Sequence, residues 1–243
     1  MSEPLAAAVA RDWGLKLGEP YPPGAAFAWV VRAELPDGAP AVLKISDPHR
    51  ESEQEADALE RWNGDGAIRL LRRDDERHAL LLERCEPGTF LSQGAADPLG
   101  VLIDLLPRLW ADAAGFHTLE DEVAWWGLDG ELGELARELA ATQGERVLVH
   151  QDLHADNVLA AEREPWLVID PKPLAAEREF AVAPIVRSSE LGHSKRDVLY
   201  RLDRLCDELG VDRGRARGWT IIQTVAWTPG AAHRLDEVVA WLR

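Results

Sequence analysis

Short apolar runs separated by turn signals dominate the first third of the chain. Residues 27–34 (FAWVVRAE) and 41–45 (AVLKI) are two such runs, and the Pro-Asp-Gly sequence between them is typical of a tight turn. They predict a β-hairpin. Good helix formers over residues 51–62 predict a helix, and the runs at 68–71 and 79–83 predict two further strands.

Beyond a break at Pro87-Gly88, the apolar positions recur mainly at helical spacing. Helices are predicted at 99–114, 130–142, 195–209 and 215–226. Two shorter runs, 147–149 and 166–169, predict strands, and each is followed by polar residues. The pattern predicts an α+β fold with two lobes: a small β-rich N-lobe over residues 1–86 and a mainly helical C-lobe over residues 87–243.

The composition is that of a globular chain, with 46% hydrophobic and 29% charged residues among 243. No apolar run approaches the roughly 20 residues that cross a bilayer, so we expect no membrane partner. The two cysteines, Cys85 and Cys206, predict free thiols in a reducing cytoplasm. Five tryptophans in helical segments favour core packing over ligand platforms: Trp62, Trp110, Trp219, Trp227 and Trp241.

The formal net charge of −16 argues against a nucleic-acid partner, because no basic surplus exists to neutralise a phosphate backbone. An acidic balance is compatible with a cationic small-molecule substrate, but it also serves solubility alone. Charge therefore leaves the substrate open.

The most informative segment is residues 147–170, VLVHQDLHADNVLAAEREPWLVID. Asp152 follows one strand-like run, Asn157 comes five residues later, and Asp170 ends the second run. Two carboxylates and a carboxamide that converge from the ends of paired strands supply an acceptor for a hydroxyl proton and oxygen ligands for Mg²⁺. These are the groups that phosphoryl transfer requires.

This segment has two other interpretations. A metal site on His150 and His154 would treat HQDLH as a relative of HExxH, but Gln151 cannot act as a general base and a strand precedes it where a helix is needed. A polar loop between two core strands, with no chemistry of its own, stays open.

Lys44 lies inside the apolar strand AVLKI, where a solvated lysine is unexpected. Such a lysine should be paired, and among the glutamates of the following helix Glu55 is expected to face the sheet. A kinase needs a cation on the ATP phosphates, and Lys44 is placed for it. The preceding segment 22–27 (PPGAAF) has one glycine, and no GxGxxG or Walker A pattern occurs in the chain.

Lys44, Glu55, HQDLHADN and IDPK together resemble the aminoglycoside phosphotransferase family, in the branch that holds streptomycin 6-kinases and hydroxyurea kinases. The resemblance spans nearly the whole chain and includes EADALERWNGDGAIRLL, LLLERCEPGTFL and LVIDPKPLAAEREFAVAPIVR. It implies a two-lobed protein-kinase-like fold and transfer of the ATP γ-phosphate, with Mg²⁺, to a hydroxyl of a small molecule such as streptomycin.

The resemblance also implies residue roles. Asp152 would be the catalytic base, and Asn157 and Asp170 the Mg²⁺ ligands. Lys44 would contact the α/β-phosphates, with Glu55 holding it. The backbone of Glu83, Arg84 and Cys85 would meet adenine. Acidic residues expected near a cationic substrate, in a cleft against the C-terminal helices, are Asp121, Glu122, Glu177, Glu179 and Glu190.

Three departures from the family pattern bear on the acceptor. Gln151 stands where the family usually has glycine, Ala181 stands where it usually has an acid, and the chain is shorter in the 91–147 region and at its end. Two alternatives follow: a kinase for hydroxyurea or another small metabolite, and a nucleotide-binding protein without transfer activity.

Overall fold

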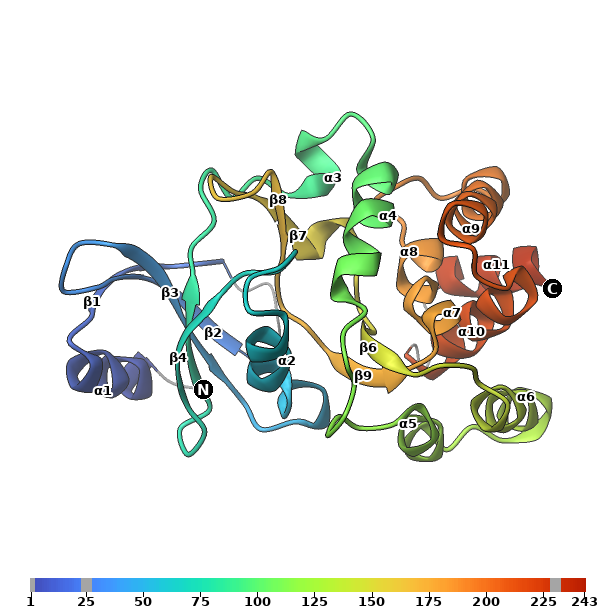
Figure 1. Cartoon of the computed structure of the whole chain (residues 1–243), viewed down its shortest axis with the longest axis horizontal. Coiled ribbons are helices and arrows are strands. Elements are labelled where there is room, and N and C mark those ends of the chain that lie inside the picture. Colours follow the sequence, from blue (N-terminus) through green and yellow to red (C-terminus); the bar gives the residue numbers. More distant parts are fainter. Residues whose placement is uncertain (1–2, 23–27, 228–232) are drawn as a thin grey trace.

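Figure 1 shows a computed structural model of the protein, which describes residues 3–22, 28–227 and 233–243. A five-stranded antiparallel sheet forms the N-terminal part of the molecule. Its strands, in spatial order, are β1 (Lys16–Pro20), β2 (Ala28–Glu34), β3 (Pro40–Ser46), β5 (Ala79–Glu83) and β4 (Leu70–Asp74). Strands β2 and β3 form the predicted hairpin. Most of the segment 22–27, and the first residue of the predicted strand 27–34, lie outside the described residues.

The two faces of this sheet have different neighbours because side chains alternate along a strand. Leu43 and Ile45 of β3 pack against α1 (Glu3–Trp13), a helix that the sequence analysis did not predict. Lys44 points to the opposite face, toward α2 (Glu55–Trp62). In Figure 1 these two helices lie on either side of the sheet. Because α1 covers one face of β3, the Lys44 side chain lies on the other face, toward α2.

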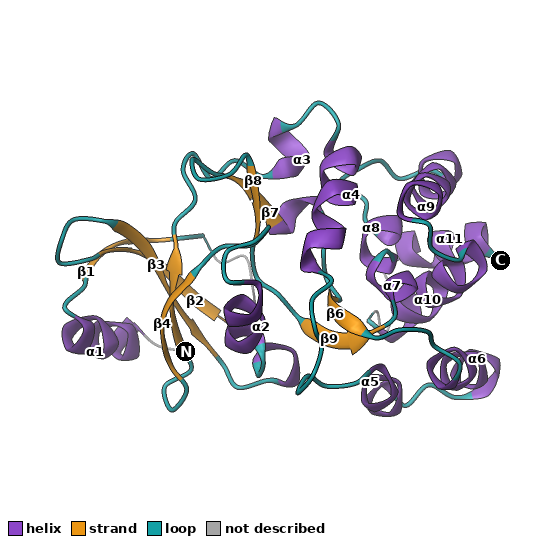
Figure 2. Cartoon of the chain, viewed as in Figure 1, coloured by secondary structure: helices purple, strands orange, loops and turns teal. Residues whose placement is uncertain are grey.

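The C-terminal part is mainly helical and carries two small antiparallel strand pairs (Figure 2). Its helices are α3 (Leu91–Gly94), α4 (Pro98–Leu109), α5 (Leu119–Trp126), α6 (Gly130–Ala141), α7 (Arg178–Ala181), α8 (Ala183–Arg187), α9 (Lys195–Leu209), α10 (Arg213–Ala226) and α11 (His233–Leu242). The strand pairs are β6 (Val147–His150) with β9 (Pro173–Ala176), and β7 (Val158–Ala160) with β8 (Trp166–Val168). Short 3₁₀ turns are η1 (Arg50–Ser52) and η2 (Ala155–Asn157).

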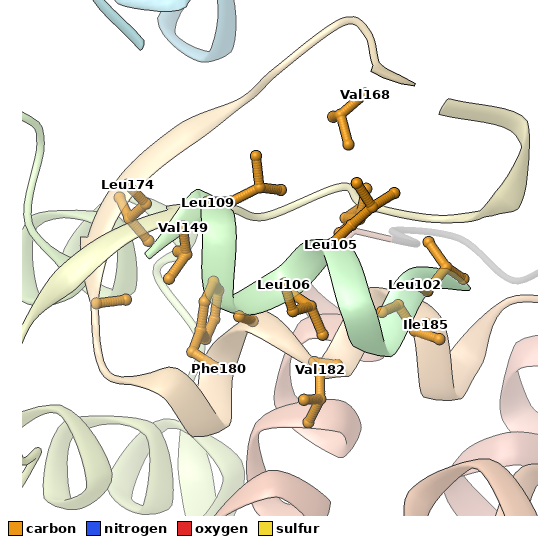
Figure 3. Close-up of a cluster of buried hydrophobic side chains, with 14 of the residues drawn as sticks. Leu102, Leu105, Leu106, Leu109, Val149, Val168, Leu174, Phe180, Val182 and Ile185 are labelled. Atoms are coloured by element: carbon orange, nitrogen blue, oxygen red, sulfur yellow. The ribbon is translucent and has the colours of Figure 1, made fainter. Parts of the chain in front are cut away.

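Helix α4 provides much of the core on which the strand pairs rest. Leu102, Leu105, Leu106 and Leu109 recur at helical spacing and are all buried. Figure 3 shows them beside side chains from β6, β8, β9, α7, α8 and the residue that joins these two helices: Val149, Val168, Leu174, Phe180, Ile185 and Val182. The strands that carry the polar loops are therefore fixed on a dry apolar surface.

One apolar cluster extends across residue 86. Trp62 of α2 and Leu82 of β5 belong to the same cluster of buried residues as Leu102 and Leu109 of α4. The indole nitrogen of Trp62 also donates a hydrogen bond to Leu109 O over 2.9 Å. The β-rich part and the helical part thus share a core, and the division of the chain at residue 86 stays a prediction.

The helix predicted at 51–62 begins only at Glu55. Gln54 precedes it with non-helical dihedral angles, because its side chain contacts a loop of the C-terminal part. Its amide nitrogen donates to Gly115 O and its amide oxygen accepts from His117 N, both over 2.8 Å. Residues 50–52 form the separate turn η1. Tertiary contacts here override the local helix preference.

The helix predicted at 99–114 ends at Leu109. Ala111 O accepts a hydrogen bond from Leu148 N over 2.9 Å, so the chain after α4 follows strand β6 and leaves the helix. The strand predicted at 68–71 begins at Leu70, because Ile68 N donates to Val168 O of β8 over 3.0 Å.

Among the described residues, no helix combines the length and the apolar character needed to cross a membrane. Both cysteines are free and buried. Burial raises the pKa of the Cys85 thiol to about 12 and that of Cys206 to about 11, so both stay protonated near neutral pH. The prediction of two free thiols is confirmed.

Candidate active site

The sequence analysis expected the polar residues to follow two strands, 147–149 and 166–169, that pair with each other. The structure has different strand pairs. Strand β6 pairs with β9, and β8 pairs with β7, so 147–149 and 166–169 are not partners. The prediction was wrong because each strand pairs with a run of only three or four residues, which carries too little periodicity to be found in the sequence.

Two loops are nevertheless brought side by side. Residues 151–157 connect β6 to β7, and residues 169–172 connect β8 to β9. Gln151 N donates to Lys172 O, and Ile169 N donates to Asn157 O, each over 2.9 Å. These two backbone hydrogen bonds link the loops near both ends, so their polar side chains share one region.

Asp152 lies on the first loop with its side chain only 15% exposed. Lys172 Nζ lies 2.7 Å from its Oδ2, and Arg187 Nη2 lies 3.4 Å from its Oδ1. Each carboxylate oxygen thus has a cationic neighbour. A carboxylate accepts about four hydrogen bonds, so room remains for a substrate hydroxyl.

Asn157 closes the same loop with its amide nitrogen turned inward. That nitrogen donates to Asp152 O over 2.8 Å and lies 3.2 Å from His154 Nε2. Because both contacts use the nitrogen, the amide oxygen is the atom that can turn toward a metal ion.

Asp170 has a backbone φ of +51°, in the left-handed region that few residues other than glycine adopt. Strain of this kind persists where surrounding contacts determine the conformation. Burial acts to raise the pKa of Asp170, but the charge and hydrogen bond of Lys44 outweigh it and lower the pKa to about 2. The carboxylate is therefore ionised at neutral pH, as a metal ligand must be.

His150 connects the two loops from beneath. Its Nδ1 accepts from Asp152 N over 3.1 Å, so its Nε2 carries the proton and donates to Ile169 O over 3.3 Å. Burial lowers the pKa of His150 to about 4, which leaves the ring neutral near pH 7. A neutral ring with both nitrogens engaged stabilises the two loops.

The predicted pair of Lys44 and Glu55 is present and buried. Lys44 Nζ lies 2.8 and 2.7 Å from the two carboxylate oxygens of Glu55, and it also contacts Asp170. Burial acts to lower the pKa of Lys44, but the two carboxylates raise it above its ordinary value. The ammonium thus stays charged and links the sheet to the second loop.

The donor set fits a magnesium ion better than a transition metal. Among the residues that the structure describes, no group of three or more His, Cys, Asp or Glu side chains could hold a metal ion. Mg²⁺ needs only one or two protein oxygens when substrate phosphates and waters complete its shell. The amide oxygen of Asn157 and the carboxylate of Asp170 are of this type.

The segment expected to meet adenine begins at Glu83, the last residue of β5, and is fixed by side-chain contacts. Arg163 binds the Glu83 carboxylate over 2.8 and 3.0 Å, and Arg69 N donates to it over 2.9 Å. Arg84 pairs with Glu86, and Cys85 is buried. The side chains are thus engaged, which leaves the backbone of this segment as the part suited to a base. Its role stays a prediction.

Within the part of the chain that the structure describes, Glu190 is the one of the five acidic residues expected near the substrate that contacts the first loop. It accepts from Ala155 N over 3.0 Å and lies 3.6 Å from His154 Nδ1. The other four carboxylates contact groups elsewhere: Asp121 caps α5 with Thr118, Glu122 pairs with Arg50, Glu177 binds Arg215 and Trp219, and Glu179 accepts from Asp212 N.

Three residues at Asp152 were missed by the sequence analysis. Lys172 belongs to the IDPK motif, and its place two residues after Asp170 was the available signal. Arg187 and Trp227 had none, because they reach the loop from α8 and the end of α10. Lys172 Nζ and the Arg187 guanidinium lie 4.9 and 5.1 Å from the Trp227 ring centre. Trp227 therefore contacts site residues, although core packing was expected of it.

Comparison with known proteins shows extended similarity. The family model described as aminoglycoside/hydroxyurea antibiotic resistance kinase matches residues 18–237. The streptomycin 6-kinase of Streptomyces griseus is 37% identical over 89% of this chain and 78% of its own length. The hydroxyurea phosphotransferase of Kitasatospora aureofaciens is 39% identical over 88% of this chain and 69% of its own length.

A solved structure extends the comparison to the fold. The choline kinase of Streptococcus pneumoniae superposes with a TM-score of 0.72, over 99% of both chains and at 13% identity. At that identity the likeness concerns the fold alone. Together with the β-rich N-terminal part and the helical C-terminal part, it confirms the predicted two-lobed kinase-like fold.

Proposed function

This chain belongs to the aminoglycoside/hydroxyurea antibiotic resistance kinase family, and from that premise we propose that it transfers the γ-phosphoryl group of ATP to a hydroxyl of a small molecule. The observation that carries the proposal is the pair of linked loops. Asp152 and Asn157 lie on the first loop and Asp170 on the second, with the charged Lys44 in contact with Asp170, and this arrangement supports the roles of base and metal ligands proposed for them.

Each residue has a defined task in this reaction. Asp152 accepts a hydrogen bond from the acceptor hydroxyl and takes its proton as the oxygen attacks the γ-phosphorus. Lys44, oriented by Glu55, binds the α/β-phosphates. Asn157 and Asp170 would hold Mg²⁺, which supplies positive charge to the phosphate oxygens when bound. The remaining barrier is lowered by positioning the hydroxyl in line with the leaving group.

The acceptor we propose is an aminoglycoside such as streptomycin, which would be inactivated by the added phosphate. The streptomycin 6-kinase of Streptomyces griseus suggests it by name, and the net charge of −16 suits a cationic substrate. Glu190 is the acidic residue best placed to contact it, since it adjoins the loop of Asp152. A cytoplasmic location fits both the use of ATP and the two free thiols.

Hydroxyurea, or another small metabolite, is the second candidate. The observation that favours it is the 39% identity to a hydroxyurea phosphotransferase, similar to the identity to the streptomycin kinase. The neighbourhood of Asp152 also includes two cations, Lys172 and Arg187, which suits a neutral acceptor at the reacting end. A nucleotide-binding protein without transfer activity has less support, because the residues for catalysis are intact.

The decisive experiment is ADP release by the purified protein with Mg²⁺ and ATP. The acceptors are streptomycin, other aminoglycosides, hydroxyurea and simple sugars, with Asp152→Ala as the blank. We expect turnover on streptomycin that the variant lacks. Turnover on hydroxyurea alone would make hydroxyurea the acceptor and leave the proposed phosphoryl transfer unchanged. ATP binding with no ADP release on any acceptor would contradict the proposed transfer.

A further inference from the structure

Lys172 occupies the point where the two loops and the N-terminal part meet. Its backbone oxygen accepts from Gln151 N over 2.9 Å, which fixes it beside the first loop. Its ammonium lies 2.7 Å from Asp152 Oδ2 and 3.5 Å from Glu51 Oε2 of η1. It lies two positions after Asp170 in the second loop. The ammonium therefore lies beside the proposed base, and the lysine shares a loop with the proposed metal ligand Asp170.

Arg187 contacts the other side of the same carboxylate. Its Nη2 lies 3.4 Å from Asp152 Oδ1, and its Nε donates to Gln223 Oε1 over 3.3 Å. Gln223 Nε2 in turn donates to Gln151 O over 2.7 Å, so helix α10 holds both the arginine and the first loop. Arg187 has a fixed position and is suited to orient Asp152.

The Trp227 ring lies beneath both cations. Lys172 Nζ is 4.9 Å and the Arg187 guanidinium carbon 5.1 Å from its centre. The face of an indole attracts cations, so one ring stabilises two positive charges on either side of one carboxylate. A lysine ammonium lacks the planar fork of donors that fixes an arginine guanidinium on its partner. The flexible stem of Lys172 therefore allows the ammonium to move by a rotamer change.

Two cations on Asp152 are unfavourable for its proposed task. Both oxygens of the carboxylate already have a cationic partner, so the acceptor hydroxyl must compete with these two contacts. A γ-phosphoryl group brings negative charge to this region, and a phosphate oxygen is a strong partner for an ammonium. Movement of the Lys172 ammonium from the carboxylate to that oxygen would remove one cationic contact from Asp152 and give the phosphate oxygen a partner.

We propose that Lys172 is a further catalytic residue, whose ammonium leaves Asp152 Oδ2 for an oxygen of the γ-phosphoryl group when ATP binds. Arg187 stays on Oδ1 and positions the carboxylate. This inference rests on the proposed function. The acceptor oxygen forms its bond to the γ-phosphorus, and its proton passes to Asp152. The bond from that phosphorus to the bridging oxygen breaks, and its electron pair leaves with ADP. Lys172 keeps its proton throughout.

The test compares ATP with ADP, because only ATP carries the group that Lys172 is proposed to contact. Isothermal titration calorimetry, in the presence of Mg²⁺, would measure both affinities for the wild type and for Lys172→Met. We expect the variant to bind ATP about tenfold more weakly and ADP with unchanged affinity. Unchanged ADP binding also shows that the variant is folded. Lys16→Met, at an exposed lysine of β1, is the matched control.

Equal affinity of Lys172→Met and the wild type for ATP would overturn the inference. An equal loss of affinity for ATP and for ADP would also overturn it, because a purely structural pair of Lys172 with Asp152 predicts that result. If the methionine variant does not fold, Lys172→Gln replaces it with the same two readouts, since it keeps a hydrogen-bond donor for Asp152 and removes the charge. This comparison needs no acceptor, so it decides the role of Lys172 even if no tested molecule is phosphorylated.

With an accepted substrate, kcat gives a second readout. Loss of a charge that meets the transferring phosphoryl should lower kcat about 10²-fold with little change in the acceptor KM. A kcat within threefold of the wild type would contradict the role of Lys172 and leave the proposed kinase activity standing. Absence of turnover in the wild type would contradict the proposed function instead.

Discussion

The ammonium of Lys44 lies 2.8 and 2.7 Å from the two carboxylate oxygens of Glu55, in an ion pair that is almost wholly buried. The pair joins the central strand β3 to helix α2. Because the same ammonium also contacts Asp170, it connects the sheet to the loop that is proposed to hold the metal. The sheet, the helix and the loop are thus aligned by one charged group.

Removal of the charge at Glu55 should weaken ATP binding. In Glu55→Gln, Lys44 keeps Asp170 as its main partner and is drawn away from the α/β-phosphates. We expect the KM for ATP to rise about tenfold, which is the effect of one charge-assisted hydrogen bond. Steady-state kinetics would measure it, with Asp57→Asn in the same helix as the control, since Asp57 pairs only at the surface. An unchanged KM would show that Lys44 needs no such partner.

Asp152→Asn should lower kcat without weakening ATP binding. An amide cannot take the hydroxyl proton, and general-base catalysis contributes roughly 10²- to 10⁴-fold. The variant also removes a negative charge from a region that receives phosphate, so the ATP affinity should equal or exceed that of the wild type. Calorimetry and ADP release would test this, with Asp156→Asn on the same loop as the control. Near-normal kcat in Asp152→Asn is the outcome that excludes it as the base.

Metal dependence should follow Asp170. Activity and ATP binding are expected to disappear when EDTA removes Mg²⁺ and to return when Mg²⁺ is restored. In Asp170→Asn, the concentration of Mg²⁺ for half-maximal activity should rise at least about tenfold, because an ionised ligand is replaced by a neutral amide. Titration of activity with Mg²⁺ would show the shift. An equal midpoint for the wild type and Asp170→Asn would show that other residues hold the metal.

Glu177 should be needed for stability, because its contacts are internal. Its carboxylate is 2% exposed, accepts from Trp219 Nε1, and binds Arg215 over 2.8–3.0 Å. Loss of one partner in such a buried pair costs about 3–5 kcal/mol. We expect Glu177→Gln to lower the free energy of unfolding in urea by about that amount, with an unchanged acceptor KM. The control is Glu145→Gln, at an exposed pair. A raised KM at wild-type stability would instead make Glu177 a substrate residue.

Stability should fall in acid because of His150. Its folded pKa is lowered to about 4 by burial, whereas an unfolded histidine has a pKa near 6.5. Between these values the unfolded chain binds more protons, so the stabilisation present above pH 6.5 is lost as the pH falls toward 4. The full loss is about 3 kcal/mol. Urea unfolding at pH 7, 6, 5 and 4 would measure it. His150→Gln should show a shallower slope, and a slope equal to that of the wild type would assign the effect to other groups.

Local order in the sequence was sufficient to place several of the candidate site residues. Asp152 and Asn157 are five residues apart on one loop, so their proximity follows from chain connectivity. Lys44 was identified because an alternating strand places it on one face, and a lysine in an apolar strand requires a partner on the next helix. The helices at 130–142 and 195–209 were predicted nearly to the residue, since their apolar stripes repeat over three or more turns.

Other features were decided by tertiary structure. The partners of β6 and β8 are strands of three or four residues, whose pairing depends on the apolar surface of α4 beneath them. Five acidic residues were equivalent candidates for a cationic substrate until packing engaged Glu177 with Arg215 and placed Glu190 beside the loop. No local pattern carries this information, because an acidic side chain has the same sequence signature on a surface and in an ion pair.

The surroundings of Asp152 show the same limit most clearly. The sequence determined that a carboxylate, an amide and a second carboxylate follow two short strands, since connectivity and periodicity act over a few residues. Only the folded chain brings Arg187 of α8 to that carboxylate, across 35 positions of sequence, and Trp227 from the end of α10 to the two cations beside it. Such contacts arise from the packing of whole helices, which is fixed by the sum of many apolar contacts and by no single motif.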